Sequence, residues 1–125
     1  MVDVTNKVRV THRQLQSWRR GVKENTVRDL FMFLPTLEFY GVNKVRREYF
    51  LAQLFTDTDG LTKVAKDPKE TFQTALDIWT EKRLNIPSDF RNFGEVVRQY
   101  SGSHRDLEKR LSWLSRLVLF VHLLK

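Results

Sequence analysis

Basic and aromatic side chains alternate in two short segments of the sequence, at residues 13–23 and 44–49. Lysine and arginine gain affinity for phosphate groups by releasing the counterions that surround a nucleic acid, and an exposed aromatic ring can stack on an unpaired base. The two segments therefore predict binding to the phosphate backbone of RNA or DNA with little sequence preference, as in a packaging, nucleocapsid-like or regulatory protein. The predicted nucleic-acid-binding residues are Arg13, Trp18, Arg19, Arg20, Lys23, Lys44, Arg46 and Arg47.

These residue types also allow other interpretations. Trp18 and Tyr49 are, taken singly, more typical of a hydrophobic core, with the basic side chains on solvated helix faces. The clustered arginines are harder to explain in this way, because positive charge without nearby compensation is self-repulsive. A basic face also suits an acidic protein partner or an anionic membrane surface, and both stay open as alternatives to a nucleic acid.

Residues 104–107 match the start of the catalytic loop of protein kinases, in which an aspartate accepts a proton from the substrate hydroxyl. The match fails on its context, because Leu111 stands where the motif needs a metal-binding asparagine and the sequence has no glycine-rich phosphate loop. Ser103 followed by Asp106 is better explained as the cap of a helix. We therefore expect a protein that is not an enzyme.

Asp57, Asp59 and Gly60 are spaced like part of a calcium-binding loop. Phe55 and Lys66 stand at the two positions where that loop needs carboxylates, so a turn is the better interpretation. The three histidines lack the spacing of metal ligands, and the absence of cysteine excludes disulfides and thiolate metal sites. We expect no metal or cofactor and an intracellular, reducing compartment, with no secretion signal or N-terminal lipidation in the first residues.

The positive charge of the chain is concentrated at its two ends. The 125 residues carry a net charge of +7, and 41% of them are hydrophobic, enough to bury one core. Residues 1–50 carry 10 Lys and Arg against 5 Asp and Glu, residues 51–100 carry 7 against 8, and residues 101–125 carry 5 against 2. We predict one helical domain over residues 11–125, with its excess positive charge at the two ends of the chain.

Caps, prolines and apolar residues one turn apart predict helices rather than strands. The clearest start is Asp67 followed by Pro68, which opens a helix over residues 68–83. Other helices are predicted over residues 12–20, 44–55 and 87–100, and from residue 26 toward Gly41 with a kink or break at Pro35. These signals predict an all-α fold, a compact bundle of about five or six helices.

Residues 1–10 are predicted to form a short extended N-terminal arm. Val2, Val4, Val8 and Val10 alternate with polar residues, which is the period of a strand. A single strand has no obvious partner in this chain, so the arm would pack over the helices or reach another subunit.

The C-terminal segment, residues 103–124, is the most hydrophobic predicted helix. Leu107, Leu111, Leu114, Val118 and Val121 recur at the spacing of a heptad seam, and a second apolar stripe runs beside them. The segment is too short and too often interrupted by polar residues to predict a transmembrane span. We expect it to be the central core helix; the alternative is a homo-oligomer interface, for which the candidate residues are Leu111, Leu114, Leu117, Val118 and Val121.

Overall fold

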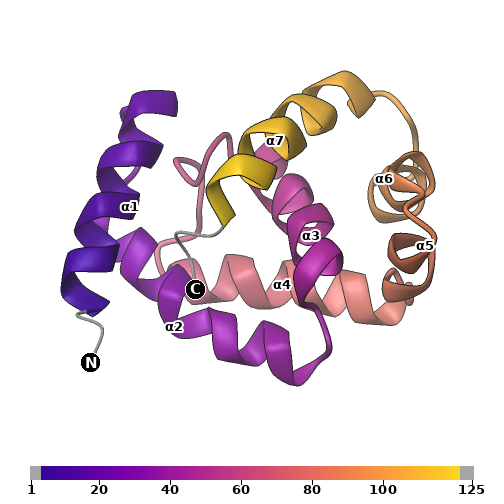
Figure 1. The fold of residues 1–125 in the computed structure, drawn as a ribbon, viewed down its shortest axis with the longest axis horizontal. Coiled ribbons are helices and arrows are strands. Elements are labelled where there is room, and N and C mark those ends of the chain that lie inside the picture. The colour runs from indigo at the N-terminus through magenta and orange to yellow at the C-terminus, as the bar shows by residue number, and fades with distance from the viewer. Residues whose placement is uncertain (1–3, 122–125) are drawn as a thin grey trace.

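The computed structural model describes residues 4–121, and these residues form an all-α bundle with no strand among them (Figure 1). The prediction of an all-α bundle is therefore confirmed. Its helices are α1 (Val4–Trp18), α2 (Glu24–Phe39), α3 (Lys44–Asp57), α4 (Pro68–Glu81), α5 (Asn85–Asp89), α6 (Phe93–Ser101) and α7 (Leu107–Phe120).

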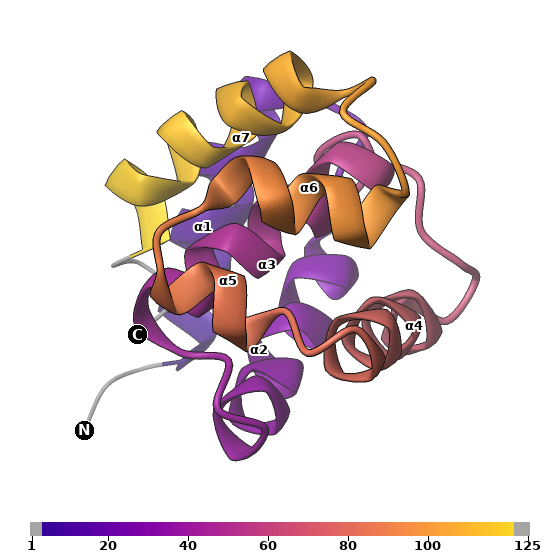
Figure 2. The same ribbon diagram turned by 90° about the vertical axis from the view of Figure 1, so that its right-hand side faces the viewer.

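Helix α3 is the centre of the bundle. Seven consecutive residues, 49–55, are buried, because the other helices cover this helix on all its sides. α3 packs against α4, α5, α6 and α7, and Figures 1 and 2 show it enclosed between them. A helix that is apolar all round is stable only when it is covered in this way. The expectation that the C-terminal helix would be the central one is therefore wrong.

Helix α7 covers α3 with one side only. Its buried stripe contains Trp113, Leu117 and Phe120, whereas the predicted seam lies beside that stripe and stays accessible. Leu111 is 42% exposed and Val118 is 49% exposed. Of the remaining interface candidates, Leu114 is half-buried and Leu117 and Val121 are buried, so the structure divides the five between core and surface.

The start of α7 differs from the prediction. The helix begins at Leu107 rather than at residue 103, and the hydroxyl of Ser103 accepts a hydrogen bond from the Arg105 N–H within the preceding turn, at 3.3 Å. Ser103 therefore stabilises a turn instead of capping the helix. Residues 122–125, which include His122 and Leu124 of the predicted helix, lie outside the described residues.

The predicted extended arm is also wrong, because α1 begins at Val4. Val8, Thr11 and Leu15 are one turn apart and are all buried, so helical spacing rather than alternation decides which side chains meet the core. Val4 and Val10, which made the pattern look strand-like, are largely exposed. Residues 1–3, which include Val2, lie outside the described range.

Of the remaining helices, α4 follows its local signals, whereas α2 and the segment after residue 84 differ from the prediction. Asp67 accepts a hydrogen bond from the Lys69 N–H at 3.1 Å, which caps α4 as predicted. The segment after residue 84 forms two helices rather than one, because Asn92 caps a new start by accepting from the Glu95 N–H at 3.1 Å. α2 continues without a break through Pro35. No helix within residues 4–121 is long and apolar enough to cross a membrane.

A buried charge joins α7 to α3. Arg110 is only 3% exposed, and its guanidinium donates to Gln53 Oε1 at 2.9 Å and to Asp57 Oδ1 at 2.8 Å. The guanidinium carbon, Cζ, lies 5.9 Å from the centroid of the Tyr100 ring. Gln53 is itself fully buried and donates to the Tyr49 carbonyl at 3.2 Å. Burial among these groups raises the pKa of the Tyr100 hydroxyl, so the ring stays neutral beside the carboxylate of Asp57.

We expect Arg110→Met to lower the free energy of unfolding by about 3 kcal/mol, because the buried Gln53 carbonyl loses its donor. Arg110→Met combined with Gln53→Leu should recover most of that loss, since both polar groups are then gone. Urea unfolding of the two variants measures this. A double variant no more stable than the single one would contradict the role given to the pair.

Candidate phosphate-binding surface

Helix α1 lies at the edge of the bundle and packs against the bundle with one of its sides. Val8, Thr11 and Leu15 face α2 and the core and are buried. Trp18 fixes the end of the helix, because its ring meets those of Trp113 and Phe120 edge to face, with centroids 5.9 Å and 5.1 Å away. Trp18 is therefore half-buried against α7 and is not free to stack on a base.

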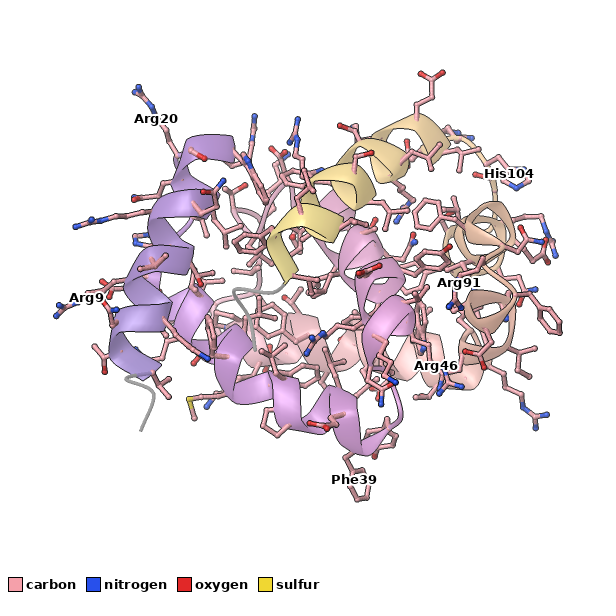
Figure 3. The ribbon with its side chains drawn as sticks, viewed as in Figure 1. Arg9, Arg20, Phe39, Arg46, Arg91 and His104 are labelled. Atoms are coloured by element: carbon pink, nitrogen blue, oxygen red, sulfur yellow. The ribbon has the colours of Figure 1, made fainter. Side chains whose placement is uncertain are left out.

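The opposite side of α1 is basic. Arg9 and Arg13 on the helix, and Arg20 just after it, are spaced by four and seven residues and so project in one direction. All three are exposed, and Figure 3 shows Arg9 and Arg20 pointing away from the rest of the molecule. We call these three residues the α1 basic face.

No negative charge within α1 compensates this face. The sequence from Val4 to Lys23 contains six lysines and arginines and no aspartate or glutamate. Within the described part of the chain, the side chains of Arg9, Arg13 and Arg20 form no ion pair or hydrogen bond. Their guanidinium groups are therefore available to an external anion.

Two other predicted residues lie near this face. Lys23 is exposed and precedes α2. Arg19 instead pairs with Asp59, in the turn after α3. Gly60 allows this close approach, because its φ is +70° and a Cβ there would lie 2.6 Å from Arg19 Cγ and 2.9 Å from the Trp113 ring. Arg19 thus ties the end of α1 to the α3 turn, and its charge is already neutralised.

Arg46 is a structural clamp. It donates to both carboxylate oxygens of Asp89, at 2.7 Å and 2.6 Å, and to the Gly41 carbonyl at 2.9 Å. These bonds join α3, the turn after α2 and α5. The hydrogen bonds raise the pKa of Arg46 and lower that of Asp89 below its usual 3.8. In Figure 3 Arg20 lies at the upper left and Arg46 lies at the lower right of centre, well apart from it.

Lys44 and Arg47 face a different region again, a groove bounded by α1, α2 and the start of α3. The structure therefore separates the predicted basic residues. Arg13 and Arg20 belong to the α1 basic face, Arg19 and Arg46 are neutralised by aspartates, and Lys44 and Arg47 line the groove. Arg9 was missed at the sequence level, because the predicted extended arm hid its spacing of four residues from Arg13.

The structure gives no place for a metal among the described residues, since no group of three or more histidine or carboxylate side chains converges there. Nε2 of His12 is hydrogen-bonded to the Val22 carbonyl at 2.9 Å, and Nε2 of His104 is hydrogen-bonded to the Gly94 carbonyl at 3.1 Å. In the turn that resembled a calcium loop, each of the two aspartates is paired with an arginine.

Comparisons with protein-family models, with curated proteins and with solved structures gave no match for this chain. Its function is therefore inferred from the chemistry of its own surface.

We expect Asp89→Asn to destabilise the protein in a pH-dependent way. Because Arg46 lowers the pKa of Asp89 below its usual 3.8, the pair stabilises the fold above that pH, and the stabilisation is lost as pH falls through the lowered pKa. Urea unfolding should show a lower midpoint for the variant near pH 7 and a smaller deficit at about pH 2. Asp77→Asn is the control, since Asp77 forms no ion pair among the described residues. An equal deficit at both pH values would contradict the assignment.

Proposed function

We propose that the protein binds the phosphate backbone of RNA or DNA through the α1 basic face, as a binding protein rather than an enzyme. The observation that carries this proposal is a row of exposed arginines, on and just after an edge helix that contains no acidic residue, with no side-chain partner among the described residues. Phosphate contacts position a protein on a nucleic acid without reading its sequence, so we infer little sequence preference.

The dimensions of the face suit an extended polyanion. From Arg9 to Trp18 at its end, α1 extends over nine residues, about 14 Å along the helix axis, and Arg20 follows just beyond. A planar guanidinium can donate two parallel hydrogen bonds to one phosphate. Gln16 is exposed on the same helix and offers further hydrogen bonds to phosphate or sugar oxygens.

An anionic membrane is a weaker fit to the same helix. A helix that lies in a membrane interface inserts an apolar face among the lipids. The buried apolar side of α1 is already packed against the core, and the exposed apolar residues of this helix are two valines, Val4 and Val10, which are too few to form such a face. An acidic protein partner would use the same charges and is distinguished by experiment.

We expect the triple variant Arg9→Gln, Arg13→Gln, Arg20→Gln to weaken binding and to reduce the slope of log K against log salt by about 2 to 3, because up to three phosphate contacts are lost. Fluorescence anisotropy of labelled single-stranded RNA and duplex DNA over a range of salt concentrations measures this slope.

The matched control is Arg83→Gln, Arg105→Gln, Lys109→Gln, which removes the same charge from exposed side chains on other helices and turns. It should change the slope far less. The proposal fails if the unchanged protein does not bind at low salt, if binding does not depend on salt, or if the two triple variants behave alike.

A second candidate function is self-association through the accessible seam of α7. Leu107, Leu111, Leu114 and Val118 form a stripe at heptad spacing that the bundle covers only in part. Such a stripe is suited to a second copy of the same helix. It could act together with the α1 basic face, because a dimer would double the number of phosphate contacts.

We expect Leu111→Lys with Val118→Lys to convert a dimer into a monomer, since charge on the seam opposes its burial. Light scattering after size exclusion measures the mass. Leu119→Lys is the control, because Leu119 is 77% exposed and lies away from the seam. An unchanged protein that stays monomeric at millimolar concentration would exclude this function.

A further inference from the structure

A groove of about 650 Å³ lies between the first half of α1, the outer side of α2 and the start of α3. This volume is in the range of sites that hold one small molecule. Its walls are mainly apolar and come from all three segments. They include Val8, Phe31, Met32, Leu34 and Val42.

The rim of the groove is positively charged. Among the described residues that line it, Lys7, Arg28, Lys44 and Arg47 are cationic and Glu38 is the one carboxylate. The charge of Arg28 is partly compensated, because its Nη2 lies 3.9 Å from Glu24 Oε1. Lys44 and Arg47 have no hydrogen bond or ion pair with another described side chain. The free positive charge is therefore concentrated at the end of the groove formed by α3.

Arg47 carries an unsatisfied donor at this end. Its Nε is shielded from solvent and has no hydrogen-bond partner. The two terminal nitrogens of the same guanidinium have no acidic partner among the described residues, and an anionic oxygen in the groove would accept hydrogen bonds from them. The start of α3 adds to the attraction, because Asn43 makes no side-chain cap hydrogen bond there and the N-terminal end of a helix carries partial positive charge.

We propose that this groove binds a single-chain anionic amphiphile of the fatty-acid class. The headgroup lies at Arg47 and the start of α3, and the chain lies along Leu34, Phe31 and Val8. Apolar walls suit a hydrocarbon chain and do not suit a phosphodiester backbone. None of the residues of the α1 basic face lines the groove, so this site is independent of the proposed function.

Isothermal titration calorimetry of the full chain with dodecanoate, kept below its micellar concentration, tests the proposal. Dodecyl maltoside and dodecyltrimethylammonium carry the same chain on neutral and cationic headgroups. We expect one dodecanoate to bind per chain, with the neutral compound about tenfold weaker, because a charge-assisted hydrogen bond is lost, and the cationic compound weaker still.

Two variants locate the site. Arg47→Gln should weaken dodecanoate binding about tenfold and leave dodecyl maltoside unchanged, since only the headgroup contact is removed. Its melting temperature should not fall, because the Arg47 side chain forms no hydrogen bond or ion pair with the described residues. Met32→Gln, on the wall of the groove, should weaken both compounds. Arg20→Gln removes an equal charge from the α1 basic face and should change neither.

Several results would overturn the proposal. These are absence of dodecanoate binding, equal affinity for all three headgroups, and equal weakening by Arg47→Gln and Arg20→Gln. Binding to anionic phosphatidylglycerol vesicles without binding to monomeric dodecanoate would also overturn it, by assigning the groove to a membrane surface. None of these results depends on whether the α1 basic face binds a nucleic acid.

Discussion

The guanidinium of Arg110 is the buried charge around which α3 and α7 are aligned. It must face Gln53 and Asp57 to keep its hydrogen bonds, and this requirement fixes the rotation of α7 about its own axis. With Arg110 turned inward, residues 113, 117 and 120 are turned inward too, because they follow at helical spacing. A rotation of α7 by about 100° would bury the seam instead. It would also turn Arg110 away from Gln53 and Asp57, which would lose their hydrogen-bond donor.

The position of α1 follows from that rotation. Trp113 and Phe120 form the surface that receives the ring of Trp18, so α1 is held at the edge of the bundle by α7 at one end and by α2 along its length. The same packing consumes the apolar side of α1 and leaves its arginines facing outward. The basic surface is therefore a consequence of how the core packs. The residues that could bind phosphate are those on the side of α1 that does not pack against the core.

The sequence was sufficient for the helices with strong local signals and insufficient for the site. Asp67 and Pro68 determine the start of α4 locally, whereas the enclosure of α3 was not predicted, because its local pattern gave only the helix and the C-terminal segment was expected at the centre. Arg110 could not be identified, because a basic residue in an amphipathic helix is normally at the surface and its partners are more than fifty residues away. Arg46 and Arg47 are adjacent in sequence but about 100° apart on α3, so one reaches α5 and the other enters the groove. Charge clusters along a chain therefore do not correspond to charge clusters on a surface.

The most direct test of this account is an NMR titration of the ¹⁵N-labelled protein with a short RNA, followed by a short DNA duplex. We expect changes in amide chemical shift to be concentrated on Arg9, Arg13, Arg20 and the residues between them on the outer side of α1. The chemical shifts of α5 and α6 should not change. Shift changes centred on α5 and α6, on the opposite side of α3, or none in any helix at low salt, would contradict it.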